Sequence, residues 1–144
     1  MKTALVTGGT RGIGLSTAKK FIDQGWNVYI TSRKDENLKA VLSDNSKLKG
    51  FVARADDLAA ATETCKKIVD EAGSLDVLIN NAGTNPSGGS LLDVDLSAVQ
   101  KTWDVNLMGP LMWTREAVKS GLKESVLNVC SVGGIKPSHF MGAY

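Results

Sequence analysis

Three glycines near the N-terminus have the spacing of a phosphate-binding turn. They lie in Thr7–Gly14 (TGGTRGIG), between the apolar run Thr3–Thr7 and an amphipathic stretch. Gly8 permits the tight turn, Gly12 lets the backbone approach a phosphate, and Gly14 lets a helix pack on a strand. The N–H groups at the start of that helix favour a diphosphate. A Walker loop is excluded because no Gly-Lys-Ser/Thr follows, and a glycine turn without a ligand is the alternative. The residues that we expect to bind the phosphates are Gly8, Thr10, Arg11, Gly12, Ile13 and Gly14.

A basic side chain follows the second apolar run, Asn27–Ser32 (NVYITS). Dinucleotide-binding domains that prefer NAD usually carry an acid at this place, which bonds the ribose 2′-hydroxyl. Here Ser32 is followed by Arg33 and Lys34. An arginine can hold a 2′-phosphate with its planar fork, and Arg11 can approach the same phosphate. The pattern favours NADP(H) over NAD(H), and a solvated basic turn is the alternative.

Asn106 precedes Pro110 by four residues in a helical stretch, Leu96–Lys119. Because proline has no N–H, the carbonyl of Asn106 loses its helical partner and needs another, such as water. A helix opened at that carbonyl suits a water-mediated proton relay, and a plain proline kink is the alternative. His139 is the only histidine, so we expect neither a metal site nor a catalytic triad.

The composition is that of a globular domain. The chain has 144 residues, 42% of them hydrophobic, and a net charge of +2. This charge gives no general basic field for nucleic acid, and no apolar run is long enough to span a membrane. Two cysteines are too few for a disulfide scaffold, so we expect a reduced, cytoplasmic compartment.

Short apolar runs alternate with amphipathic stretches along the whole chain. This alternation predicts an α/β fold, a doubly wound parallel sheet of the Rossmann type, with residues 1–144 forming one dinucleotide-binding domain. Further strands are expected at Gly50–Ala53, Asp76–Asn80 and Val126–Cys130. Helical stripes place Ile13, Thr17, Phe21 and Ile22 inward, then Leu38, Val41 and Leu42, then Ala61, Cys65, Ile68 and Ala72. Trp103, Met108, Met112 and Trp113 are expected to pack on the long helix.

Five motifs in order carry a resemblance to the short-chain dehydrogenase/reductase family. They are the Gly-x-x-x-Gly-x-Gly turn, Asn80–Gly83 (NNAG), Asn106 in DVNL, Ser131 in NVCSVGG, and Tyr144, 13 residues after Ser131. An extended-type epimerase would show Gly-x-x-Gly-x-x-Gly instead. The resemblance covers the whole chain but only about the first half of a usual family member, so we expect the fold to be truncated after about five strands.

The resemblance implies an NADP(H)-dependent oxidoreductase that moves a hydride between the nicotinamide and a carbonyl or secondary alcohol. It assigns Tyr144 as acid/base, Ser131 as the anchor of the substrate oxygen and Asn106 as part of the proton relay. Asn81, Ala82 and Gly83 would border the nucleotide. It also implies a small-molecule substrate and a homo-oligomer. The family commonly has an aspartate after the third strand, where an ungapped alignment places Arg54, with Asp56 and Asp57 following; the adenine contact stays open.

The sequence stops at Tyr144, before the lysine of the family motif Tyr-x-x-x-Lys. We therefore expect residues 1–144 to be part of a longer reductase and, on their own, to bind NADP(H) with little turnover. The last strand would then form an apolar sheet edge, and the side of the long helix bearing Leu111 and Trp113 would lack a neighbour. The alternative is a non-catalytic NADP(H)-binding or interaction module.

Overall fold

Five parallel strands form one sheet in the order β3-β2-β1-β4-β5. The computed structural model describes residues 1–136, 139, 141–142 and 144. Because the strand order reverses between β1 and β4, a crevice opens at the carboxyl ends of these two strands. The predicted doubly wound fold is confirmed. The strands are β1 Thr3–Val6, β2 Asn27–Ser32, β3 Leu48–Val52, β4 Val77–Asn80 and β5 Ser125–Asn128.

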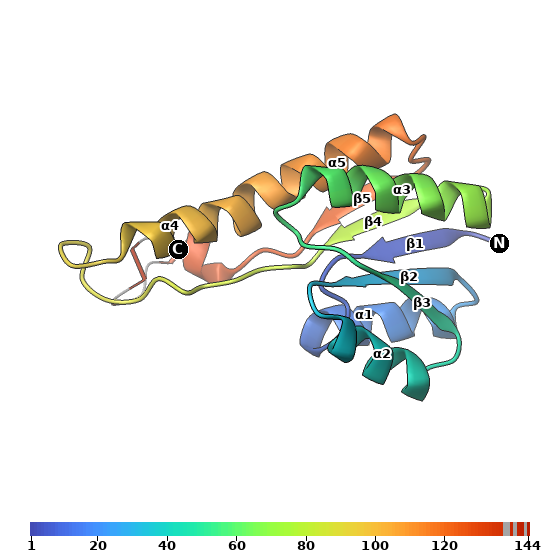
Figure 1. The fold of residues 1–144 in the computed structure, drawn as a ribbon, viewed down its shortest axis with the longest axis horizontal. Coiled ribbons are helices and arrows are strands. Elements are labelled where there is room, and N and C mark those ends of the chain that lie inside the picture. Colours follow the sequence, from blue (N-terminus) through green and yellow to red (C-terminus); the bar gives the residue numbers. More distant parts are fainter. Residues whose placement is uncertain (137–138, 140, 143) are drawn as a thin grey trace.

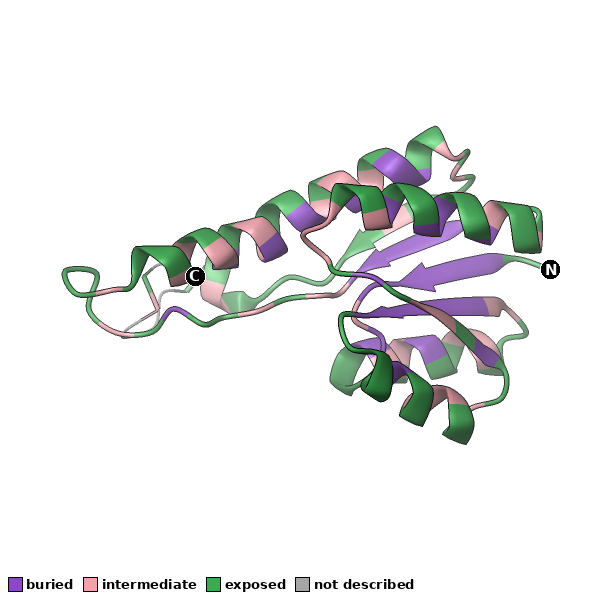
Figure 2. Cartoon of the chain, viewed as in Figure 1, coloured by how far each residue is buried: buried purple, intermediate pink, exposed green. Residues whose placement is uncertain are grey.

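Helices cover both faces of this sheet (Figure 1). On one face lie α1 (Gly12–Asp23) and α2 (Asp35–Asp44), and on the other α3 (Leu58–Ala72) and α5 (Gly109–Lys119). The helix α4 (Leu96–Trp103) and the segments that follow β4 and β5 extend beyond the sheet. Buried residues gather on the central strands and on the inward sides of the helices (Figure 2). Two apolar clusters, one on each face, therefore hold the sheet in place.

The long helical stretch is interrupted by a π-helical turn. Between α4 and α5, residues Asp104–Met108 form this turn, η1, in which the N–H of Gly109 donates to the carbonyl of Asp104. The irregularity expected from Pro110 is present, but as a widened turn instead of a kink. A glycine is needed at position 109 for a steric reason, because a β-carbon there would lie 2.9 Å from the carbonyl oxygen of Ala55. The turn therefore brings the helix against the loop after β3.

Trp113 packs as expected, although its side of the helix was also expected to lack a neighbour. Two other expectations for the long helix, the packing of Trp103 and Met108, were wrong. Trp113 is 1% exposed, because its ring packs in the core below α3 and its Nε1 donates to the carbonyl of Ala55 at 3.1 Å. Trp103 and Met108, expected to pack, are instead exposed. Leu111 is exposed as expected. An apolar side chain on a helix is buried only where a neighbouring element faces it.

The β5 strand is an edge of the sheet, as expected. It pairs with β4 alone, and Leu127 is exposed. The strand covers Ser125–Asn128, so its end falls two residues before the predicted Cys130. The main chain then runs through Ser131 into a short 3-10 turn, η2 (Val132–Gly134).

Candidate functional site

A cleft of about 560 Å³ lies at the carboxyl ends of β1 to β4. The loops after these four strands form its walls, and α1 and α4 contribute their first and last turns. This is the crevice in which open α/β sheets bind their ligands. The residues that line it are Gly8, Thr10–Gly14, Thr31–Lys34, Asn37, Ala53–Asp56, Asn81–Thr84, Lys101 and Val105.

The glycine turn forms one wall of the cleft in the conformation that its sequence predicts. Gly8 and Gly12 have φ angles of +65° and +53°, a region that side chains rarely adopt. A β-carbon at Gly8 would also lie 3.0 Å from the Cα of Ala82, whereas Gly12 faces open space. The turn therefore leaves its backbone open at Gly12, where the first N–H groups of α1 begin.

Gly14 is required by a neighbouring loop as well as by the strand. A β-carbon at Gly14 would lie 2.4 Å from Nδ2 of Asn81 and 2.6 Å from the carbonyl oxygen of Gly8. That Nδ2 donates to the carbonyls of Thr7 and Gly8, at 2.9 and 3.1 Å. The hydroxyl of Thr7 accepts from the N–H groups of Asn81 and Ala82, each at 3.1 Å. Asn81 thus fixes the glycine turn to the loop after β4.

Ile13 does not lie on the buried face of α1, where periodicity placed it. Its side chain is 64% exposed and lines the cleft. Gly14 and Ala18 are the buried residues of α1, because only small side chains fit where the helix crosses the sheet. The assignment of Ile13 to cofactor binding is compatible with this position.

Three cations stand together at the end of the cleft formed by β1 and β2. They are Arg11, Arg33 and Lys34, all of which line it. Lys34 reaches Glu36 at 3.8 Å, but neither guanidinium makes an ion pair with any residue in the described part of the chain. The hydroxyl of Ser32 accepts from the N–H of Lys34 at 3.2 Å and so orders the turn. Two unpaired guanidinium groups are well suited to a phosphate.

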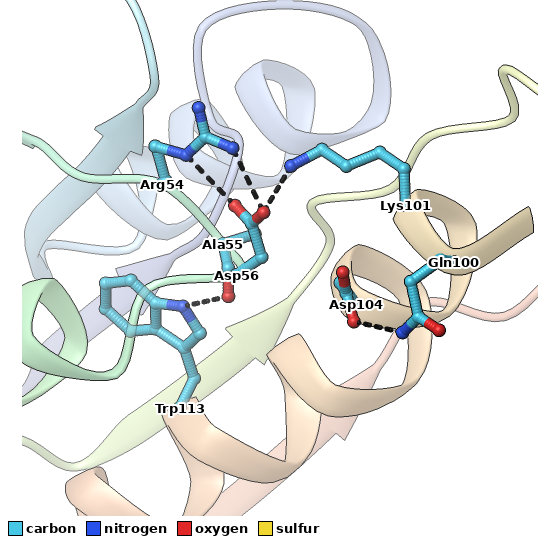
Figure 3. Close-up of polar contacts among 7 residues, drawn as sticks. All are labelled: Arg54, Ala55, Asp56, Gln100, Lys101, Asp104 and Trp113. Atoms are coloured by element: carbon cyan, nitrogen blue, oxygen red, sulfur yellow. Dashed lines mark hydrogen bonds and ion pairs between the residues drawn. The ribbon is translucent and has the colours of Figure 1, made fainter. Parts of the chain in front are cut away.

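The loop after β3 carries an ion-pair cluster instead of the family's usual aspartate (Figure 3). Nε and Nη2 of Arg54 donate to the two carboxylate oxygens of Asp56, at 3.2 and 3.0 Å. Lys101 on α4 also bonds Asp56. The Arg54 guanidinium, aided by Lys101, lowers the pKa of Asp56 from 3.8 to about 2. Arg54 and Asp56 both line the cleft, whereas Asp57 caps α3 by accepting from the N–H of Ala60.

Asn106 borders the cleft through Thr84. Its Oδ1 accepts from the N–H of Thr84 at 2.8 Å, and its Nδ2 donates to the carbonyl of Thr84 at 2.7 Å. Thr84 and Gly83 both line the cleft. The side chain of Asn106 is therefore engaged with the loop after β4, and its main chain lies in the π-helical turn.

Ser131 and Tyr144 meet at Gly133. A β-carbon at Gly133 would lie 3.3 Å from the Ser131 hydroxyl and 3.4 Å from two ring carbons of Tyr144. The Ser131 hydroxyl accepts from the N–H of Gly133 at 3.1 Å, and Tyr144 is 42% exposed. Neither residue, nor Asn106, is part of the cleft lining. The structure thus brings the serine and the tyrosine together, outside the cleft that the glycine turn forms.

Comparison with known proteins settles the family. The family model for short chain dehydrogenases matches residues 2–144. The chain belongs to this family. It is 32% identical over 99% of its length to dehydrogenase/reductase SDR family member 4 of Pongo abelii, and 30% identical to tropinone reductase-like 3 of Erythroxylum coca. It covers 54% and 57% of these two proteins, so the chain spans just over half the length of the curated relatives it matches.

Solved structures of short-chain dehydrogenases resemble this fold closely. A variant of actinorhodin polyketide ketoreductase with NADPH superposes with a TM-score of 0.94 at 27% identity, over 99% of this chain and 58% of that one. ElxO with NADP bound gives 0.91 at 29% identity, over 99% and 60%. The family assignment confirms the resemblance drawn from the five motifs, and its members are oxidoreductases.

Sequence reasoning missed three residues of this site. Thr7 and Lys101 gave no signal, because a strand-end threonine and a helix lysine are common on any domain. Asn37, on α2, faces the cleft only because α2 begins directly after Lys34. Among the described residues, no group of three or more possible metal ligands comes together. In the same part of the chain, no helix is both long and apolar enough to cross a membrane.

Proposed function

We propose that the whole protein carrying this chain is an NADP(H)-dependent oxidoreductase acting on a small carbonyl or secondary alcohol. The observation that carries the proposal is the pair of unpaired guanidinium groups, Arg11 and Arg33, beside the open glycine turn. Among the described residues that line the cleft, none at the end of β2 is acidic, and Asp56, in the loop after β3, is the one carboxylate.

The cleft suits each part of such a dinucleotide. The N–H groups at the start of α1 can bind the diphosphate, and the two guanidinium groups the 2′-phosphate. Asn81, Ala82 and Gly83 follow β4 and line the cleft beside the glycine turn. NADPH, when bound, supplies the hydride. The cationic end of the cleft favours this cofactor over NADH, since the 2′-phosphate is the group that distinguishes them.

The remaining roles are assigned to Ser131, Tyr144 and Asn106. The Ser131 hydroxyl and the ring of Tyr144 both lie beside Gly133. In this proposal the two side chains bond one substrate oxygen. The tyrosine would then give its proton to that oxygen or accept one from it. The main-chain carbonyl of Asn106, which can accept no hydrogen bond from Pro110 four residues later, would hold a water of the proton relay. The family relationship and the NADPH-bound structural neighbours support these roles.

Exposed apolar residues support a homo-oligomer. Trp103, Leu107 and Leu111 are exposed, at four-residue intervals along the α4–α5 stretch. A second copy covering this stretch would remove the three side chains from water. Sedimentation analysis of L107D tests this: dissociation of an oligomer supports it, and an unchanged monomer contradicts it.

The activity is tested with the whole protein, NADPH and a panel of aldehydes and ketones, by the loss of absorbance of the reduced nicotinamide. Wild type should oxidise NADPH, and Y144F should lose at least a hundredfold in kcat while its Kd for NADPH stays unchanged. Nucleotide binding by wild type without turnover on any carbonyl or alcohol would contradict hydride transfer. K67A, which removes a lysine of α3 outside the cleft, is the control.

A further inference from the structure

The ion-pair cluster at the end of β3 stands in the cleft without a part in the proposed function. The cluster consists of three residues that line the cleft: Arg54, Asp56 and Lys101. Both cations form ion pairs with the carboxylate of Asp56. Figure 3 shows the Arg54 guanidinium and the Lys101 ammonium approaching the carboxylate from two sides. An arginine held in this way still has an exposed side chain that a ligand in the cleft can contact.

The backbone that carries Arg54 is fixed at four points. The N–H of Ala53 donates to the carbonyl of Ser32 at 2.8 Å, which ties the loop to the end of β2. Trp113 binds the carbonyl of Ala55, and Gly109 packs against the same atom. Asp57 begins α3 as its N-cap. Arg54 therefore projects from a loop that has little freedom to move.

The guanidinium of Arg54 is also fixed in orientation. Its two bonds to Asp56 form a fork in which Nε and Nη2 share one carboxylate, so the plane of the group is set. The side chain of Asp56 is only 14% exposed, whereas that of Arg54 is 57% exposed. Because the fork uses in-plane N–H groups, it leaves the two π faces of the guanidinium free.

The guanidinium plane of Arg54 lies where the adenine end of a bound dinucleotide is expected. In a doubly wound fold the diphosphate lies at the glycine turn after β1, and the ribose lies at the end of β2. The next strand outward is β3, and Arg54 follows it directly. The base attached to that ribose therefore reaches the loop that bears Arg54.

We propose that Arg54, oriented by Asp56, is a stacking platform for the adenine ring of the cofactor. The proposal rests on the proposed function. A planar cation on an aromatic face contributes affinity without selecting the ribose phosphate, so the platform serves NADPH and NADH alike. Asp56 acts as a positioning residue, and Lys101 offsets the carboxylate charge so that it does not repel the nucleotide.

The test is the Kd of R54A, R54F and R54K for NADPH and for NADH, by tryptophan fluorescence quenching or calorimetry. R54A should weaken both dinucleotides by the same factor, about two- to fivefold. R54F, which keeps a flat face without charge, should restore most of the affinity; R54K, which keeps charge without the flat face, should not. R115A, which removes an arginine of α5 outside the cleft, is the control, and melting temperatures check folding.

Two patterns overturn the inference. If R54A weakens NADPH alone, or if R54K restores binding and R54F does not, Arg54 acts as a phosphate cation. If R54A binds both dinucleotides as wild type does, Arg54 contacts no part of them. In each case wild type still binds NADPH and the proposed function stands. Wild type that binds neither dinucleotide would instead refute the proposed function, and this inference with it.

Discussion

Both ends of the Asn106 amide bind the main chain of Thr84. Oδ1 accepts from its N–H at 2.8 Å and Nδ2 donates to its carbonyl at 2.7 Å. This pair connects the π-helical turn η1 to the loop after β4, at the border of the cleft. The side chain of Asn106 therefore serves the loop, and the proposed function assigns proton transfer to its main-chain carbonyl.

Replacing Asn106 tests the first half of this division. N106A removes two part-buried hydrogen bonds of the Thr84 main chain, each of which contributes about 0.5–1.5 kcal/mol. The amide hydrogen of Thr84 should then exchange about tenfold faster or more, as measured by hydrogen exchange. Q100A, on the exposed side of α4, is the control. Unchanged exchange at Thr84 in N106A would show that the loop is held by other contacts.

The small residue at Gly14 is required by Asn81. In G14A the new β-carbon would meet Nδ2 of Asn81 at 2.4 Å, so the amide must leave the carbonyls of Thr7 and Gly8. We expect a loss of roughly 1–3 kcal/mol in the free energy of unfolding, as in other overpacked sites. Urea denaturation measures it. G134A, where a β-carbon meets open space, should stay within about 0.5 kcal/mol of wild type; equal stability of G14A would refute the contact.

The ion pairs of Asp56 should make stability depend on pH in the acid range. The pKa of Asp56 is lowered to about 2 in the folded protein by Arg54, against an ordinary value of 3.8. A group whose pKa is lowered on folding contributes its full stabilisation above the pKa of the unfolded state. This contribution is lost as the pH falls toward the pKa of the folded state. The contribution, roughly 1 kcal/mol because the partners are exposed, should therefore disappear between about pH 4 and pH 2.

D56N isolates this contribution. Subtracting its free energy of unfolding from that of wild type cancels the other carboxylates, since both proteins share them. The difference should be positive at pH 7 and shrink toward zero near pH 2. A difference that is constant from pH 7 to pH 2 would show that the charge of Asp56 does not stabilise the fold.

Most of the fold could be predicted from the sequence, because each strand is a short apolar run and each turn is marked by glycine or a polar cluster. The predicted Asn27–Ser32 strand matches β2, and a glycine, Gly73, ends α3 at a φ of +78°. Ile13 was misplaced because helical periodicity cannot tell a buried face from a ligand-binding one. The partner of Trp113 could not be predicted because Ala55 lies 58 residues away in the sequence.

The parts of the candidate site that carry a sequence motif could be predicted. The parts formed by contacts between separate elements could not. The glycine turn, Asn81 and Arg33 lie together at the cleft, as their motifs indicated. The bond between Asp56 and Lys101 joins residues of ordinary type from separate elements, so no local pattern marks it. No local pattern marks the position of Ser131 and Tyr144 beside Gly133 either, because it depends on the path of the chain after β5.

The central claim is that the two unpaired guanidinium groups of the cleft, those of Arg11 and Arg33, select NADP(H) through its 2′-phosphate. The most direct test is the Kd of wild type and R33A for NADPH and for NADH, with K67A as the matched loss of charge outside the cleft. A charge-assisted bond of about 1.5–3 kcal/mol predicts that R33A binds NADPH roughly ten- to a hundredfold more weakly. Its affinity for NADH should stay unchanged. Equal weakening of both dinucleotides, or a wild type that prefers NADH, would contradict the account.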